Sequence, residues 1–315
     1  AWSSDPFLPQ VRNGHLIGRG AADAKGSVVA MAAALAVTAT VTPDLDGRVV
    51  LTSVADEEAG GAGTLDWLHR GGQADVAIVG EPTDMRICPA TRSSRRLTLT
   101  VAGRSAHPGE AFDGVNAIET AMGLVAALRK LARDLDRDRP HPLWAHLPEQ
   151  HVFNVQSVRG GELGGPGRVP DSCMVELAVG GTAAEELADL QQEVEEAVNQ
   201  WVQGDAWLRE HPPELAWAPM AMHGSVTPAD HYLVAACTAA WASARGSEAP
   251  VGALSGVTDM RHLVRHGGIP TLNFGPGRRA DAPMLRRPAF PPGTLPFGFA
   301  ILVASAVALF INQAY

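Results

Sequence analysis

Three consecutive carboxylates at the end of an apolar run constrain this chain more than any other feature. Residues 49–55 have the length and the β-branched content of a buried strand, and Asp56, Glu57 and Glu58 follow directly. Adjacent carboxylates beside a buried strand repel one another and lose solvation, so they are typical of sites that bind cations or transfer protons. The triplet indicates metal-assisted chemistry, and a solvated acidic turn is the simpler alternative.

The first part of the chain alternates between helical and strand patterns. Residues 28–38 are Ala-rich with interleaved Val and Met, as in a helix, whereas residues 49–54 and 76–79 are short apolar runs bounded by turn residues. Strands that are apolar throughout and alternate with helices are typical of a parallel sheet covered on both faces. We therefore predict an α/β catalytic domain with a mostly parallel sheet flanked by helices.

A different pattern starts near residue 92 and predicts an inserted domain. Its order, β-α-β-β-α-β, indicates an α+β unit with a four-stranded sheet and two helices on one face. We expect this domain at residues 92–220, between catalytic segments 1–91 and 221–315. The expected strands are residues 97–101, 153–158, 174–179 and 214–218; the expected helices are residues 115–128, with Asp113 as candidate cap, and 185–202.

The remaining segments return to the catalytic domain. We expect a helix at residues 231–244 and strands near Val251 and Thr271. The apolar run at residues 297–311 is shorter than the roughly 20 residues that span a bilayer, so it is interpreted as a buried terminal helix.

Composition narrows the classes of partner. The 315 residues carry a net charge of −9, which argues against binding to nucleic acid or to an anionic membrane. The three cysteines have no disulfide or zinc spacing, and no signal peptide opens the sequence, so a cytoplasmic location is expected.

Four motifs accompany the acidic triplet along nearly the whole chain. They are residues 18–26 (GRGAADAKG), 79–83 (VGEPT), 103–108 (GRSAHP) and 258–261 (TDMR). In this order and at these distances, the five motifs resemble the metallopeptidase M20 family, of the acetylornithine deacetylase, succinyl-diaminopimelate desuccinylase and aminoacylase type. The resemblance implies that the inserted domain is a lid and dimerisation domain, and that the protein is a homodimer.

The resemblance also implies roles for four carboxylates. Asp23 would bridge two divalent metals (Zn, Co or Mn), Glu58 and Glu81 would each hold one of them, and Glu57 would be the general base. A cis peptide bond is expected after Asp23. The structural alternatives are a helix cap for Asp23 and a plain turn residue for Glu81.

Three further residues are candidates for contacts with the reacting substrate. His107 resembles the lid histidine that reaches into the partner subunit's site and stabilises the oxyanion, although a lone histidine in this setting is more often structural. Arg261 is a candidate substrate-carboxylate anchor, with a salt bridge to Asp259 or Asp230 as the alternative. Asn116 is a candidate substrate-binding residue, and a structural role in the lid is its stronger interpretation.

The sequence departs from the family pattern at four positions. The family's His-x-Asp motif would precede Ala1, and Asp281 stands where a second histidine ligand is expected, so Asp281 becomes a candidate metal ligand. In the expected lid, Gly167 stands where the family has an Asn. The position of the family's substrate-binding Arg falls near Gly180, so that arginine is absent here.

Two functions remain after this comparison. The first is a metal-dependent amidohydrolase of altered specificity, which cleaves the N-acyl bond of a small amino-acid-like or peptide-like substrate. The alternative is a metal-poor relative that serves as a binding protein or performs non-hydrolytic acyl chemistry in a biosynthetic pathway.

Overall fold

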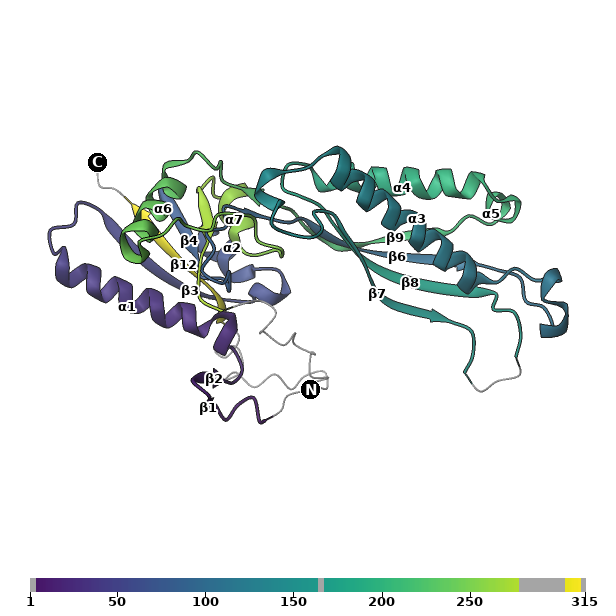
Figure 1. Cartoon of the computed structure of the whole chain (residues 1–315), viewed down its shortest axis with the longest axis horizontal. Helices are drawn as coiled ribbons and strands as arrows, with labels where there is room; N and C mark the ends of the chain where they lie inside the picture. Colours follow the sequence, from purple (N-terminus) through teal and green to yellow (C-terminus); the bar gives the residue numbers. More distant parts are fainter. Residues whose placement is uncertain (1–3, 164–166, 278–303, 313–315) are drawn as a thin grey trace. The chain divides into compact units, whose positions relative to one another are not determined.

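The chain divides into two compact units. The computed structural model describes residues 4–163, 167–277 and 304–312 (Figure 1). The first unit combines both ends of the chain, Ala1–Thr91 and Ser225–Tyr315, and the second is Arg92–Gly224. Each unit has its own sheet and its own buried core.

The main sheet of the first unit has the described strand order β11-β4-β12-β3. β11 runs parallel to β4, whereas β12 runs antiparallel to both β4 and β3. It follows that β3, β4 and β11 point in the same direction, so their carboxyl ends share one edge of the sheet. The bounds are β3 Arg48–Ala55, β4 Val76–Val79, β11 Thr271–Asn273 and β12 Ala304–Asn312.

Helices cover both faces of this sheet. Alternate residues of β4 point to opposite faces, and each set packs against different helices. Ala77 and Val79 lie in a cluster with residues of α2 and α7, while Val76 and Ile78 lie in a cluster with residues of α6. This arrangement confirms the predicted α/β class. The helices of the unit are α1 Gly26–Val41, α2 Ala62–His69, α6 Tyr232–Arg245 and α7 Met260–Arg265.

Part of the apolar run near the end of the chain is a strand and not the expected terminal helix. Residues 304–311 belong to β12, which pairs with β3 and β4, whereas residues 297–303 lie outside the described residues. A short apolar run has the same pattern in a buried helix and in a central strand, so periodicity could not separate them. The strand expected near Val251 is reduced to a single bridge to Ile87.

Helix α1 is unusually apolar on its exposed side. With the preceding turn it forms Ala21–Val41, which is the one helical stretch among the described residues that is long and apolar enough to cross a membrane. Length and composition alone are weak evidence for such a role. Ser27 and Met31 of α1 are buried against Gly80 at the end of β4, so this helix also packs on the sheet.

Two short antiparallel pairs complete the first unit. They are β1 (Gln10–Arg12) with β2 (His15–Ile17), and β5 (Ala90–Thr91) with β10 (Ser225–Val226).

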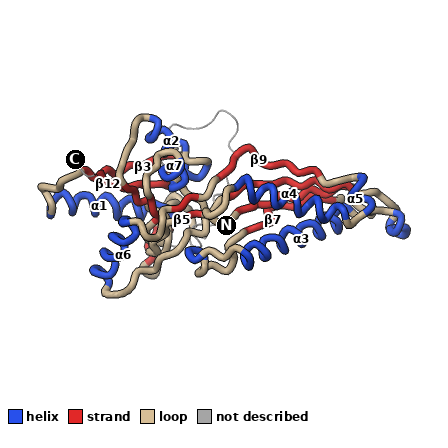
Figure 2. Tube along the Cα trace, turned by 90° about the horizontal axis from the view of Figure 1, so that it is seen from above, coloured by secondary structure: helices blue, strands red, loops and turns tan. Residues whose placement is uncertain are grey.

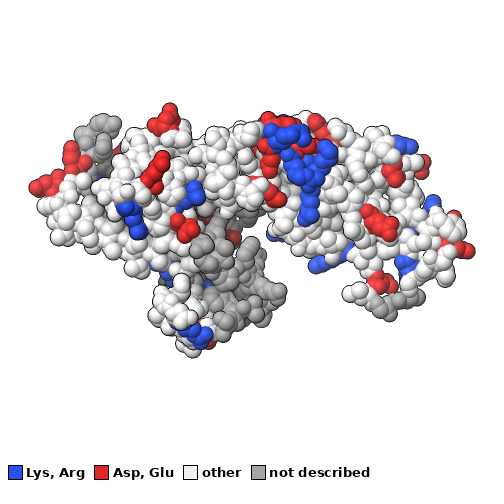
Figure 3. All heavy atoms as spheres, in the orientation of Figure 1, with Lys and Arg blue, Asp and Glu red and all other residues white. Residues whose placement is uncertain are grey.

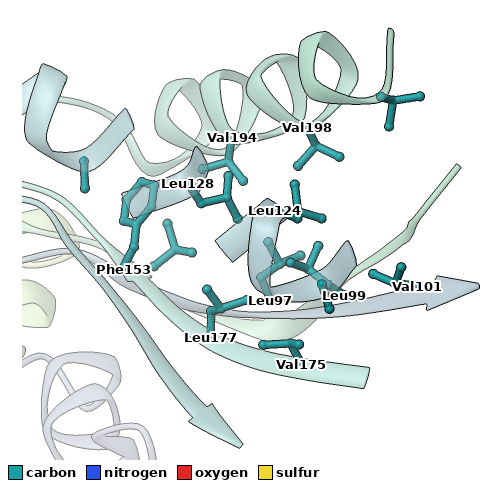
Figure 4. Close-up of a cluster of buried hydrophobic side chains, with 14 of the residues drawn as sticks. Leu97, Leu99, Val101, Leu124, Leu128, Phe153, Val175, Leu177, Val194 and Val198 are labelled. Carbon is teal, nitrogen blue, oxygen red and sulfur yellow. The ribbon is translucent and has the colours of Figure 1, made fainter. Parts of the chain in front are cut away.

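The second unit has the predicted order of strands and helices. Its antiparallel sheet has the strand order β7-β8-β6-β9, and Figure 2 shows α3 and α4 along the strands. Leu124 and Leu128 of α3 and Val194 and Val198 of α4 pack on strand residues such as Leu177 in one continuous core (Figure 4). The bounds are β6 Ser94–Ala102, α3 Ala117–Asp138, β7 Val152–Gly160, β8 Ser172–Gly180, α4 Leu187–Gln203, α5 Ala206–Glu210 and β9 Glu214–Met222.

The start of α3 differs from the sequence prediction. Asn116, and not Asp113, is the N-cap: its Oδ1 accepts hydrogen bonds from the amides of Ile118 at 3.0 Å and Glu119 at 3.3 Å. Asp113 instead ends the preceding 3₁₀ turn, Pro108–Asp113. Both side chains are good caps, so the sequence alone did not fix the first helical residue.

Charged side chains of both signs mix on the surface of this unit. Figure 3 shows acidic and basic groups together at the C-terminal end of α3, where Lys130 and Arg137 both pair with Asp134.

Candidate active site

The acidic residues of the first unit lie at one edge of its sheet. β3 ends at Ala55, two residues before Glu57, and β4 ends at Val79, two residues before Glu81. The carboxyl ends of like-directed strands in an α/β sheet are the usual place for a ligand site. The edge that carries Glu57, Glu58 and Glu81 is therefore the candidate active site.

Glu57 and Glu58 lie in a tight turn. They open the 3₁₀ turn Glu57–Ala59, which is flanked by Asp56 at φ 71° and by Gly60 at φ 134°. The amides of Ala59 and Gly61 both donate to the carbonyl of Asp56, at 3.2 and 2.7 Å. Positive φ at a non-glycine residue costs roughly 1–2 kcal/mol, so the surrounding contacts must hold this turn in place.

Glu81 and the segment of Asp23 are close to the same loop. Glu81 is 1% exposed, and its backbone oxygen would lie 2.6 Å from a Cβ atom placed on Gly275. The same Cβ would lie 2.6 Å from Oγ of Ser27, at the start of α1. Asp23 precedes this helix within the turn Ala21–Lys25, and the expected cis bond follows it. The loop after β11 thus joins the segments of Asp23 and Glu81.

Asp281 lies outside the described residues. The loop that leads toward it is pinned to the segment after Glu81, because Gly275 exchanges hydrogen bonds with Thr83 and the amide of Asp84 donates to Gly277 at 2.7 Å.

The residues at this edge fit a divalent cation by their chemistry. They offer carboxylate oxygens, Glu81 is withdrawn from water, and Oγ of Ser27 is buried without a hydrogen-bond partner among the described residues. Nevertheless, no group of three His, Cys, Asp or Glu side chains within residues 4–163, 167–277 and 304–312 is close enough to form a metal centre. The fit to a divalent cation therefore rests on the chemistry of the oxygen donors and on their place at one edge of the sheet.

The sheet register staggers the ends of the two strands that precede Glu58 and Glu81. Ala55 pairs with Ala304, whereas Val79 pairs with Ala308, so the ends of β3 and β4 are offset by 308 − 304 = 4 residues along β12. The register of β12 shifts between Ala304 and Ala306, and on β3 the partner of Ala308 is Thr52, three residues before Ala55, so the stagger is roughly 10 Å at about 3.3 Å per residue.

Arg261 lies beside the Glu57 turn and binds backbone carbonyls. Its Nη1 donates to the oxygen of Thr258 at 3.0 Å and its Nη2 donates to the oxygen of Gly60 at 2.8 Å. Asp259 is 4.0 Å away, which agrees with the salt bridge considered from the sequence. Burial lowers the pKa of Arg261, while the charges of Asp259 and Glu57 raise it.

Two residues that the sequence did not indicate lie next to this contact. Nε2 of His262 also donates to the oxygen of Gly60, at 2.8 Å, and burial lowers the pKa of this imidazole. Asn273 is fully buried at the end of β11 and accepts a hydrogen bond from Oγ1 of Thr258 at 2.9 Å. The TDMR motif indicated the start of this helix. The roles of His262 and Asn273 could not be predicted, because they depend on contacts with residues that are distant in sequence.

His107 lies in the second unit, in a hollow of about 390 Å³ lined by Ser105, Ala106, Gly167 and Arg168. Its Nδ1 accepts a hydrogen bond from the amide of Gly109 at 3.2 Å. In a neutral imidazole the proton then resides on Nε2, which is the tautomer that can donate to an oxyanion.

Two other positions of the second unit, Asn116 and Gly180, have structural explanations. Asn116 uses its Oδ1 as the cap of α3, as described above. Gly180 ends β8 so close to the oxygen of Ser93 that a Cβ would lie 2.5 Å from it. An arginine does not fit at this position without a shift of the backbone.

Comparisons with known proteins agree on one family. The model described as peptidase family M20/M25/M40 matches residues 1–308. The chain is 31% identical to N-formyl-4-amino-5-aminomethyl-2-methylpyrimidine deformylase of Bacillus subtilis, over 88% of this chain and 68% of that protein. It is 33% identical to succinyl-diaminopimelate desuccinylase of Thioalkalivibrio sulfidiphilus, over 51% of this chain and 46% of that protein.

Solved structures with low sequence identity share the fold. The M20 family metallo-carboxypeptidase Sso-CP2 from Sulfolobus solfataricus has a TM-score of 0.60 at 15% identity, over 87% of this chain and 72% of that chain. Aminopeptidase PepT from Bacillus cereus has a TM-score of 0.59 at 18% identity, over 85% of this chain and 67% of that chain.

Proposed function

Because the chain belongs to peptidase family M20/M25/M40, we propose that it is a metal-dependent amidohydrolase that cleaves the N-acyl bond of a small amine. The observation that carries this function is the edge at which Glu57, Glu58 and Glu81 follow strands that point in the same direction. Two relatives are a deformylase and a desuccinylase, which supports hydrolysis over the alternative of a metal-poor binding protein.

The substrate that the comparisons favour is an N-formyl amine with a small heterocyclic body. The deformylases of Bacillus subtilis and Halalkalibacterium halodurans match 88% and 89% of this chain, whereas the succinyl-diaminopimelate desuccinylase of Thioalkalivibrio sulfidiphilus matches about half of it. N-succinyl or other N-acyl amino acids are the second candidate.

The carboxylates divide the work of the reaction. Asp23, Glu58 and Glu81, joined by Asp281, would hold the metal. When bound, a divalent cation polarises the acyl carbonyl and acidifies water. Glu57 takes the proton of the attacking water and delivers it to the departing amine. The Nε2–H of His107 donates to the oxygen that becomes negative in the tetrahedral intermediate.

Assembly and location form the remaining part of the proposal. We infer a homodimer through the Arg92–Gly224 unit, so that His107 acts in the site of the partner subunit. A cytoplasmic location is in keeping with Cys88, Cys173 and Cys237, which are all free thiols.

A substrate panel tests this function. The purified protein, supplied in turn with Zn, Co and Mn, is given the N-formyl aminomethylpyrimidine, N-succinyl-diaminopimelate and N-acetyl amino acids, and release of the free amine is measured. Metal-dependent release that is fastest from the formyl substrate is expected. No release from any of them with any metal would contradict the proposed function.

A further inference from the structure

One carbonyl oxygen anchors the turn that carries Glu57 and Glu58. The oxygen of Gly60 accepts from Nη2 of Arg261 and from Nε2 of His262, both at 2.8 Å. These donors are consecutive residues of α7, are 6% and 7% exposed, and are separated from the turn by about 200 residues of sequence. Such a long-range, buried pair of bonds fixes the turn against the body of the unit.

The turn combines left-handed backbone angles with direct contacts to the start of α7. Asp56, Gly60 and Gly61 all have positive φ, at 71°, 134° and 76°. A Cβ on Gly61 would lie 2.1 Å from Oδ1 of Asp259 and 2.7 Å from the ring of His262, so the backbone of the turn lies directly on these two side chains. The position of Glu57 therefore depends on the start of α7.

The start of α7 is itself braced from two sides. Oγ1 of Thr64, in the first turn of α2, donates to Oδ2 of Asp259 at 2.6 Å. From the other side, Asn273 accepts from Oγ1 of Thr258 at 2.9 Å and donates to Sδ of Met260 at 3.2 Å. Since Asn273 is in β11, which pairs with β4, the bracing connects the strand before Glu81 with the turn of Glu57.

We propose that Arg261 and His262 are positioning residues, which set the Glu57–Glu58 turn relative to Glu81 by binding the carbonyl of Gly60. Arg261 thereby has a different role from the substrate anchor that the sequence suggested, because Nη1 and Nη2 both donate to backbone oxygens. The catalytic consequence rests on the proposed function, whereas the effect on the turn does not.

Amide exchange and kinetics of an Arg261→Ala variant test this role. Loss of the guanidinium removes one of two bonds to Gly60, so exchange at residues 56–61 should accelerate about tenfold. In the active enzyme kcat should fall about 100-fold while KM changes less than about threefold, and added guanidinium ion should restore part of kcat. Arg70→Ala is the control and should match the parent, because Arg70 follows the end of α2 and its side chain is 78% exposed.

His262 provides a second pair of variants in case Arg261→Ala does not fold. Gln keeps a nitrogen donor near Nε2 and should exchange like the parent, whereas Leu removes it and should accelerate exchange at residues 56–61.

Three results would overturn the positioning role. The first is unchanged exchange at residues 56–61 in Arg261→Ala, and the second is equal exchange in the Gln and Leu variants of His262. The third is a KM raised more than about tenfold with kcat unchanged, which would make Arg261 a substrate anchor. Because exchange is measured without substrate, a parent that turns over nothing would defeat the proposed function alone.

Discussion

The imidazole of His151 lies 2.7 Å from Glu185, measured from Nε2 to Oε1, and its Nδ1 lies 2.7 Å from Oδ1 of Asp136. Both ring nitrogens face a carboxylate, and both therefore carry a proton in the form that satisfies this geometry. His151 thereby joins the C-terminal part of α3 to the loop before α4. This buried group is a pH-dependent tie within the second unit.

The tie predicts how stability depends on pH. Burial lowers the pKa of His151. The hydrogen bonds and charges of Glu185 and Asp136 raise it by more than burial lowers it, so the pKa of His151 lies above its ordinary value. A raised folded-state pKa gives stability that is complete below the unfolded value of about 6.5 and is lost as the pH rises through the folded value. The unfolding free energy should therefore fall as the pH rises above about 6.5.

A His151→Gln variant checks this pH dependence by urea unfolding at several pH values. It should lose about 3 kcal/mol at pH 6, because the two carboxylates lose a cation, and less at pH 9. If the parent and the variant show the same slope of unfolding free energy against pH, His151 is not the titrating group.

The Asn116 cap predicts a loss of stability without a loss of chemistry. Asn116→Ala leaves the amides of Ile118 and Glu119 without their acceptor, so the unfolding free energy should fall by about 1 kcal/mol. Asn116→Asp retains the acceptor and serves as the matched control. A raised KM in the alanine variant at unchanged stability would instead assign Asn116 to substrate binding.

The sequence was most informative where periodicity and length agree. The alternation of residues 97–101 and the apolar stripe of residues 115–128 predicted β6 and α3, since each pattern belongs to one kind of element. It failed for residues 304–311, because a short run that is apolar throughout is typical both of a central strand and of a buried helix.

The sequence likewise predicted some features of the candidate site and missed others. The place of Glu57, Glu58 and Glu81 at the sheet edge could be predicted, because each follows the end of an apolar strand and such an end is visible in the sequence. His262 and Asn273 could not, since their roles arise from contacts with Gly60 and Thr258 that only the folded chain brings together.

Metal dependence can be tested through Glu81. Dialysis against a chelator should abolish hydrolysis, and Mn, Co or Zn should restore it. Glu81→Gln removes a charged ligand at a buried position, so restoration should require at least about tenfold more metal than in the parent. The control is Glu119→Gln, because Glu119 lies on α3 in the second unit and not at the sheet edge of the first unit. Equal metal requirements in the parent and in Glu81→Gln would exclude Glu81 as a ligand.

His107 can be tested across subunits. His107→Ala should lower kcat by about 100- to 1000-fold, because one donor to the oxyanion is lost. If the histidine acts in the partner's site, mixing inactive His107→Ala with inactive Glu57→Gln should restore about one quarter of the parent activity, since half of the random dimers contain one intact site of two. A mixture that stays inactive although heterodimers form would exclude a shared site.

The most direct test of the account is the rate of metal-dependent amide hydrolysis by Glu57→Gln beside the parent. Gln keeps the size of the side chain but cannot accept the proton of the attacking water, so kcat should fall by about 10²- to 10⁴-fold while bound metal and KM remain nearly unchanged. If instead the metal-loaded Glu57→Gln protein hydrolyses the substrate as fast as the parent, Glu57 is not the base, and the central claim is contradicted.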